Sequence, residues 1–452
     1  MNEHRYLPMT DQDRASMLAT IGVESIEDLF SDIPETIRYR ERLNVGEKLS
    51  EPDLLRYMRK LAAKNADTDR FASFLGAGMY DHHLPVVINH MLLRGEFFTA
   101  YTPYQAELSQ GELQAIFEFQ SYICELTGMQ VANASMYDGA TALAEAAALA
   151  YGATKRTEII VSHAVHPEAR EVLRTTAKGL GLTVVEIPVQ ADGQTSLHAL
   201  EQRINQNTAA VLVQSPNFYG IIEPLQAFSD AAHAVGALSV VSANPMSLAL
   251  LEAPGKLGAD LCVGDCQPFG IPVSLGGPSC GYFSATEALM RKIPGRIVGQ
   301  TVDKSGRRGF VLTLQAREQH IRREKATSNI CSNQALMALA ASIYLSTMGK
   351  EGLRDVAKLN INKAHYAASL VQKSSRMSLK YAASFFNEFV VELPESIDID
   401  GLNEVLLKTG IIGGYNLGKT DASLNRHMLI AVTETRTKEE IDGFFARLEE
   451  LL

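Results

Sequence analysis

The stretch GADLCVGDCQPFGIPVSLGG, residues 258–277, joins an apolar segment to a glycine-rich turn. Large α/β enzymes often keep a reactive group where such a strand ends. Cys262 and Cys266 suggest a thiol or a metal site, and Ser274 suggests a nucleophile. The setting suggests a cofactor lysine, yet the most reactive position holds Gln267.

Five similar strand-like segments accompany this one in the middle of the chain. They are TEIIVSH (157–163), TVVEIPV (183–189), AAVLVQSPN (209–217), LSVVSANP (238–245) and SCGYFSA (279–285). Helix-length segments separate most of them, and such alternation predicts a mostly parallel sheet covered by helices.

The flanks differ from this central region and predict three domains. Residues 1–70 form a helical arm, since Thr10 with Asp13 and Ser50 with Asp53 have capping-box spacing. Residues 71–330 form the large α/β domain. Residues 331–452 contain a long helical stretch, two short apolar strands and a terminal helix, which indicates a smaller α+β domain.

Composition excludes several classes of protein. The 452 residues are 46% hydrophobic and 21% charged, which is ordinary for a globular protein. The net charge of -10 argues against nucleic acid as a partner, and RRGF (307–310) and IRREK (321–325) are expected on a solvated helix face or loop. No apolar run approaches membrane-spanning length, and five scattered cysteines fit reduced thiols, so we expect a cytoplasmic protein without a membrane partner.

The loops contain one candidate phosphate site. Neither GxGxxG after the first strand nor GxxxxGK[ST] occurs, but NASMYDGATALAEAAALA begins at Asn133. Its polar turn, with Ser135, Asp138 and Gly139, opens an alanine-rich helix whose backbone N–H groups could hold a phosphate. A plain capped helix packed on the sheet is an equally good interpretation.

The order of these elements resembles the fold-type I pyridoxal-phosphate enzymes. Such enzymes need a lysine for the aldimine, an aspartate beside the pyridine nitrogen and a backbone cup for the phosphate. Here the strand that would supply the aspartate offers Ser242 and Asn244, and the lysine position is Gln267. The chain therefore resembles a cofactor enzyme without its reactive groups, and its phosphate cup is expected to be vestigial.

Three further stretches resemble one family. FFTAYTPYQAELSQGELQAIFEF (97–119), NASMYDGATALAEA (133–146) and GAGMYDHHLPVVI (76–88) are similar to the N-terminal half of the glycine-cleavage P-protein, a pyridoxal-phosphate glycine decarboxylase that some organisms divide into two subunits. The resemblance covers almost the whole chain and is weakest after about Ser375. Ala106 departs from the pattern, because a proline is usual there, and this loosens the expected loop.

The resemblance implies a role in the glycine cleavage system. The aldimine lysine would belong to a homologous partner subunit, which would hold pyridoxal phosphate covalently. Glycine would lose CO2 there, and its aminomethyl group would pass to the lipoyl arm of the H-protein. We expect an α2β2 assembly in which this chain shapes the site without performing the covalent step, so that this chain alone is inactive.

The YTPYQ loop is the expected contribution of this chain to that site. Tyr101, Thr102, Tyr104 and Gln105 offer hydroxyl and amide groups around Pro103 that could line the partner's site and bind a small anion. Alternatively, the tyrosines pack at the subunit interface with their hydroxyl groups satisfied locally. Ser109 with Glu112 also has capping-box spacing, which could fix the loop to the following helix.

The remaining candidates have plainer interpretations. Asp81, His82 and His83 form DHH, a possible metal motif with DTD (67–69) and DID (398–400), although a polar turn before a helix is favoured. The cysteines lack a second pair at zinc spacing and are expected to be buried, and Ser274 lacks a GxSxG context. His163 and His166 are expected to serve packing or an interface.

Two other classes of function stay open on the sequence alone. One is a self-sufficient enzyme that uses a metal through DHH or binds pyridoxal phosphate without a covalent bond. The other is a structural or regulatory pseudoenzyme.

Overall fold

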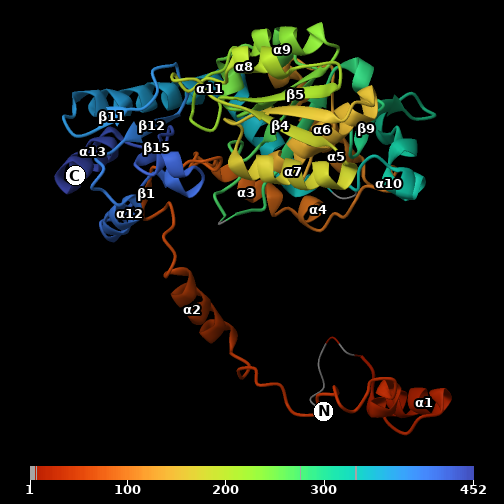
Figure 1. The fold of residues 1–452 in the computed structure, drawn as a ribbon. Coiled ribbons are helices and arrows are strands. Elements are labelled where there is room, and N and C mark those ends of the chain that lie inside the picture. The colour runs from red at the N-terminus through yellow and green to blue at the C-terminus, as the bar shows by residue number, and fades with distance from the viewer. Residues whose placement is uncertain (1–5, 7, 275, 331–332) are drawn as a thin grey trace. The chain divides into compact units, whose positions relative to one another are not determined.

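The computed structural model describes residues 6, 8–274, 276–330 and 333–452 of the chain (Figure 1). These residues fall into two compact units, residues 1–65 and 66–452. The predicted boundary between a large and a small domain at residue 330 lies within the second unit and stays a prediction.

The first unit contains short helices with well-formed starts. They are α1 (Asp11–Ile21), the 3-10 helix η1 (Ile26–Phe30) and α2 (Glu51–Ala62). The predicted capping box of Thr10 and Asp13 is confirmed, and the Ser50 side chain accepts a hydrogen bond from Asp53 N. None of these helices has a buried residue, so the unit has no core of its own along its helices.

A seven-stranded sheet forms the centre of the second unit, with the strand order β2-β8-β7-β6-β5-β3-β4. The strands are β2 (Val131–Ala132), β3 (Glu158–Ser162), β4 (Thr183–Ile187), β5 (Thr208–Ser215), β6 (Leu238–Ala243), β7 (Leu261–Asp265) and β8 (Gly281–Ala285). Neighbours from β4 to β7 are parallel, whereas β8 is antiparallel to both β7 and β2. The predicted mostly parallel sheet is therefore confirmed.

Helices cover both faces of this sheet (Figure 1). The helices of this part of the chain are α3 (Val86–Leu92), α4 (Gly95–Phe98), α5 (Gln110–Thr127), α6 (Gly139–Thr154), α7 (Pro167–Leu180), α8 (Leu197–Arg203) and α9 (Leu225–Ala234). Successive strand residues point to opposite faces, so Ile160 packs in the core with α5 and α9, while Ile159 and Val161 pack with α6 and α7. The apolar runs of the sequence follow from this burial on both sides.

An antiparallel hairpin shows that the expectation for the RRGF motif, a solvated helix face or loop, was wrong. β9 (Ile297–Val302) pairs with β10 (Arg308–Thr313), so most of the RRGF motif lies in a strand rather than on a helix face or loop. Phe310 is buried against α5, and this contact holds the basic motif in extended backbone. The IRREK motif spans the end of α10 (Gln319–Arg322) and the 3-10 turn Arg323–Lys325.

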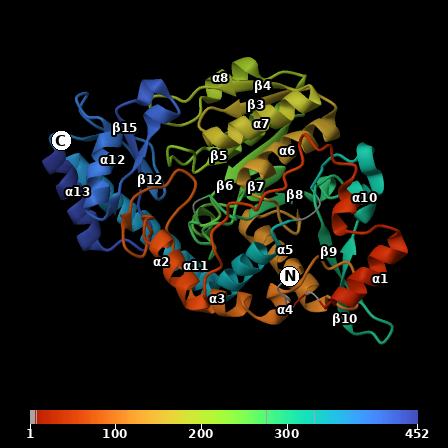
Figure 2. The same ribbon diagram turned by 90° about the horizontal axis from the view of Figure 1, so that it is seen from below.

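The C-terminal elements form a second sheet. A four-stranded sheet has the order β11-β12-β15-β14. Its surroundings include the long helix α11, which passes beside α3 and α5 (Figure 2). The elements are α11 (Ala335–Lys373, kinked at Gly349), β11 (Ser378–Leu379), β12 (Glu388–Glu392), α12 (Ile399–Lys408), β14 (Tyr415–Asn416), β15 (His427–Ala431) and α13 (Lys438–Leu451).

The chain segment before α3 also joins these elements. β1 (Ala72–Ser73) pairs in parallel with β13 (Ile411–Ile412). Short 3-10 helices complete the second unit at Ser247–Ala249, Pro254–Leu257, Glu287–Leu289, Gln315–Arg317, Leu417–Lys419 and Ala422–Leu424. Within the described residues, every helix is too short or too polar to cross a lipid bilayer.

Candidate functional site

Gln267 follows the end of β7 and is 1% exposed. Its side-chain oxygen accepts a hydrogen bond from Tyr80 N at 3.0 Å, and its Nε2 donates to Tyr80 O at 2.8 Å and to Ile271 O at 2.9 Å. The amide thus pairs with the backbone of Tyr80 as a neighbouring strand would. This position joins two chain segments and offers no amine to an aldehyde.

The start of α6 holds a carboxylate from the same chain. Asp138 caps the helix by accepting from Thr141 N at 2.7 Å, whereas Gly139 N donates to Asp265 Oδ2 at 3.0 Å. Ser135 is buried, and its Oγ accepts from Asn333 Nδ2 at 2.7 Å and from Gln334 N at 3.1 Å. Of the three predicted cup residues, only Gly139 presents its N–H to an anionic group, and that group is Asp265.

The aspartate that a pyridoxal-phosphate site needs beside the pyridine nitrogen is also missing. Strand β6 ends with Ser242 and Ala243, and Asn244 accepts from Met246 N at 3.0 Å, so no carboxylate stands where a pyridine nitrogen would need one. Together with Gln267 and the Asp265 carboxylate, this shows that the residues present do not fit the cofactor.

Residues 76–83 cross from the large sheet to the C-terminal sheet. Besides the Gln267 pair, Tyr80 donates its hydroxyl to Glu388 Oε2 at 2.9 Å, and Ala77 N donates to Glu388 Oε1 at 2.7 Å. Burial raises the pKa of Glu388 to about 7. The segment is therefore fastened to both sheets by its backbone and by one buried acid.

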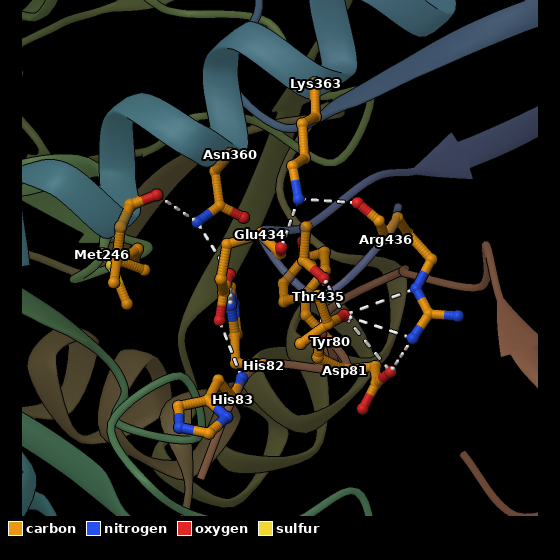
Figure 3. A network of polar contacts seen from close by, with 12 residues as sticks. Tyr80, Asp81, His82, His83, Met246, Asn360, Lys363, Glu434, Thr435 and Arg436 are labelled. Atoms are coloured by element: carbon orange, nitrogen blue, oxygen red, sulfur yellow. Dashed lines mark hydrogen bonds and ion pairs between the residues drawn. The ribbon is translucent and has the colours of Figure 1, made fainter. Parts of the chain in front are cut away.

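The DHH motif faces the turn that follows β15 (Figure 3). His82 Nδ1 lies 2.8 Å from Glu434 Oε2, and His83 N donates to Glu434 Oε1 at 2.7 Å. Asp81 forms an ion pair of 2.8 Å with Arg436. Burial favours the neutral form of Glu434, but the contact with His82 and the backbone hydrogen bonds, including that from His83 N, together outweigh burial and lower the pKa of this carboxyl.

This arrangement accounts for the motif without a metal. Asn360 Nδ2 also donates to Glu434 at 3.0 Å, and Lys363 Nζ donates to the carbonyl groups of Glu434 and Arg436. Asp67, from DTD, pairs with Arg70, and Asp398, from DID, caps α12. In the part of the chain that the structure describes, no three His, Cys, Asp or Glu residues are grouped to hold a metal ion.

The YTPYQ loop lies on the surface around one buried residue, Pro103. Tyr101 is 76% exposed and Tyr104 is 63% exposed, with ring centroids 6.3 Å apart. The buried Arg296 lies 5.3 Å from the ring of Tyr104 and donates to its hydroxyl at 3.4 Å. The side chain of Gln105 is exposed and that of Thr102 is half-buried.

A small apolar cavity of about 120 Å³ lies next to this loop. Its lining includes Phe97, Phe98, Glu112, Ile116 and Leu339. Burial raises the pKa of Glu112, although the charge of Arg296 opposes the shift. Ala100, which directly precedes the loop, lines this cavity together with Glu112.

The predicted capping box at Ser109 is wrong. Ser109 does precede α5, but its side chain makes no cap hydrogen bond. The neighbouring Gln110 holds the loop instead. Its side chain donates to Ala106 O at 2.7 Å and to Phe310 O at 2.8 Å, and it accepts from Phe310 N at 2.9 Å. The loop is held by the β10 strand, which the sequence interpretation missed.

The other candidate residues are structural. Cys262 and Cys266 are buried in one core, and burial raises the pKa of the Cys262 thiol to about 12. His166 caps α7, and its Nε2 lies 2.8 Å from Ala77 O, while His163 pairs with Glu186. Ser274 is exposed.

Sequence reasoning missed four residues of these networks. Asp265, Glu388, Glu434 and Arg436 all lie within or just after a strand. A carboxylate inside the apolar segment FNEFVVELP (386–394) was the available signal for Glu388, since an acid is rarely buried without a partner.

Comparison with solved structures defines the class of fold. A sphingosine-1-phosphate lyase from Burkholderia pseudomallei superposes with a TM-score of 0.66 at 16% identity, over 92% of this chain and 93% of that chain. A NifS-like protein gives a TM-score of 0.64 at 15% identity, over 84% and 99%. The chain has the fold of the fold-type I pyridoxal-phosphate enzymes, as its sequence predicted.

A narrower match gives the family. The model of the glycine cleavage system P-protein family matches residues 4–448, and the chain belongs to this family. Proteins named probable glycine dehydrogenase (decarboxylating) subunit 1 are 59% identical in Brevibacillus brevis and 58% identical in Bacillus subtilis, each over 99% of both chains. A crystal structure of an inhibitor-bound glycine decarboxylase (P-protein) of the glycine cleavage system superposes with a TM-score of 0.90 at 42% identity, over 100% of both chains.

Proposed function

We propose that this chain is the lysine-less subunit of a two-subunit glycine decarboxylase. The observation that carries the proposal is Gln267, whose amide is fully engaged with the backbone where an aldimine lysine would stand. The chain has the family's fold and is similar over nearly its whole length to proteins named subunit 1, yet it lacks the reactive group. A homologous partner subunit must therefore supply the lysine.

The partner would hold pyridoxal phosphate covalently in this proposal. Glycine binds there and loses CO2, and the aminomethyl group passes to the lipoyl disulfide of the H-protein. Two copies of each chain form the assembly. Names of the relatives imply a second subunit, while the H-protein, glycine and the α2β2 stoichiometry are parts of the proposal.

The YTPYQ loop is the part of this chain that we assign to the partner's site. Its support is the exposure of both tyrosines beside a rigid, buried Pro103, with the Arg296 guanidinium behind Tyr104. Phenol hydroxyl and amide groups held in this way can bind a carboxylate or phosphate without reorganising. Exposed tyrosines on a fixed loop also suit an interface.

Reconstitution tests the proposal. The chain is purified alone, its homologous lysine-bearing subunit is purified alone, and glycine-dependent exchange of labelled CO2 is measured for each and for the mixture, with H-protein present. Exchange is expected only in the mixture. Exchange by this chain alone would instead support a self-sufficient enzyme, and a mixture no faster than the partner alone would support a regulatory or structural pseudoenzyme.

A further inference from the structure

Three hydrogen-bond donors converge on the carboxylate of Asp265. Gly139 N donates to Oδ2 at 3.0 Å, Gln267 N donates to Oδ1 at 2.9 Å, and the Ser279 hydroxyl also donates to Oδ1. They come from the start of α6, the turn after β7 and the segment before β8. A helix N-terminus joined to further N–H and O–H donors is a typical cradle for a phosphate group.

The close approach of α6 to β7 depends on Gly139. A Cβ atom added there would lie 3.1 Å from Asp265 N and 3.1 Å from the carbonyl carbon of Gly264. Neither backbone atom can move aside without disturbing the strand. The fold thus keeps the geometry that lets a helix N-terminus reach an acidic group, although that group is part of the chain. Burial raises the pKa of Asp265, whereas the hydrogen bonds from Ser279, Gly139 N and Gln267 N oppose this shift.

We propose that Asp265 is the internal ligand of a retained anion site, in which its carboxylate takes the place of a phosphate group. The occupied cradle excludes phosphate-bearing cofactors from this chain, so that pyridoxal phosphate binds only at the partner's site. The occupation of the cradle rests on contacts within this chain and does not depend on the activity proposed above.

Asp138 provides a matched control at the same helix end. Its carboxylate accepts from Thr141 N and not from the donors of the cradle. Asp138→Ala removes a helix cap but leaves Asp265 in place, whereas Asp265→Ala leaves the cap and empties the cradle. The two variants therefore separate loss of a cap from opening of an anion site.

Thermal unfolding in inorganic phosphate tests the proposal, with sodium chloride matching the ionic strength. We expect the melting temperature of Asp265→Ala to rise with phosphate, by about 2 °C at a concentration tenfold above the dissociation constant. The wild-type protein and Asp138→Ala should show no such rise. A melting temperature of Asp265→Ala that does not respond to phosphate contradicts the proposal, as does an equal response of all three proteins.

A second measurement covers the case in which Asp265→Ala does not fold. Equilibrium dialysis of the wild-type chain with labelled phosphate and with pyridoxal phosphate should find no specific site. If one phosphate binds per wild-type chain and Asp265→Ser abolishes that binding, Asp265 is a ligand-binding residue rather than the occupant, and the proposal is overturned. Asp265→Ser should instead gain phosphate binding.

Discussion

Glu388 is an acid buried in β12, with the Ala77 N–H on one carboxylate oxygen and the Tyr80 hydroxyl on the other. Burial raises its pKa to about 7, from the ordinary value of 4.5. The folded protein therefore keeps a proton on Glu388 at pH values where the unfolded chain has lost it. The stability that this proton confers is complete below pH 4.5 and is lost as the pH rises through about 7.

The free energy of unfolding should accordingly depend on pH through this residue. Between pH 5 and pH 8, the wild-type protein should lose up to about 3 kcal/mol more than Glu388→Gln does, because glutamine stays neutral. Its oxygen can accept from Ala77 N, and its NH2 group can donate to the Tyr80 oxygen. Urea denaturation at several pH values measures this difference. Parallel pH profiles of the two proteins would contradict the raised pKa.

Tyr101 and Tyr104 offer a second test at the scale of single residues. If their hydroxyl groups bind the carboxylate of glycine or the cofactor phosphate, Tyr101→Phe or Tyr104→Phe should slow CO2 exchange in the reconstituted complex by about tenfold to a thousandfold. Association of the subunits should not change. If both variants exchange CO2 at the wild-type rate, the hydroxyl groups do not bind these anions. The tyrosines then only pack at the subunit interface, which is the alternative left open by the sequence.

Among the elements, the segment 76–83 and the turn 433–436 depend on one another. Glu434 accepts hydrogen bonds from His83 N and Asn360 Nδ2 and pairs with the His82 ring. These partners lie 74 or more positions from Glu434 in the sequence. The side chains of Glu434, His82 and Asn360 are buried and cannot turn to water for a replacement partner, whereas His83 is exposed.

Removal of Glu434 should therefore be costly. Glu434→Ala is expected to lower the free energy of unfolding by about 3–5 kcal/mol, since a buried pair loses one partner. Glu404→Ala, on the exposed side of α12, is the control and should have little effect. Treatment with a chelator should leave the stability of the wild-type protein unchanged, and destabilisation by the chelator would revive the metal interpretation of DHH.

The elements themselves differ in how well the sequence predicts them. The long strands of the parallel sheet were predictable because apolar residues fill both of their faces. The β9–β10 hairpin was not, since Arg307 and Arg308 give β10 a polar start. The burial of β10 depends on α5, which comes much earlier in the chain. The two-residue strand β2 is too short to leave a periodic pattern.

The candidate site also has features that the sequence predicted and features that it did not. The residue types at the strand ends showed that Gln267 stands at the lysine position and that β6 lacks an aspartate. The contact of Asp265 with Gly139 was not, because it follows from the position of β7 in the strand order and from the direction of α6. Contacts of this kind join residues 126 positions apart, and no local pattern encodes them.

At the scale of the whole molecule, apolar residues remain on the surface of the first unit. Leu54, Leu55, Met58 and Leu61 of α2 are between 38% and 52% exposed, and their spacing places them on one side of the helix. Large apolar patches on a soluble protein usually mark a contact with another chain. We expect this face to be covered in the complex with the partner subunit.

Charge on that face should weaken the complex. The double variant Leu55→Asp, Met58→Asp, co-expressed with the partner, should give a smaller fraction of heteromer in gel filtration at micromolar concentration. Lys60→Ala, on the opposite side of α2, should give the wild-type fraction. If the double variant assembles like the wild-type protein, the α2 face is not part of the interface.

The occupied cradle at the start of α6 also bears on how the subunit is made in the cell. Here the side chains of Asp265 and Gln267 form hydrogen bonds with other segments of the same chain, without a cofactor. If Asp265 occupies the cradle as proposed, we expect newly synthesised chains to mature without vitamin B6. During vitamin shortage this subunit should thus accumulate in a finished form, and the supply of active enzyme should follow its partner alone.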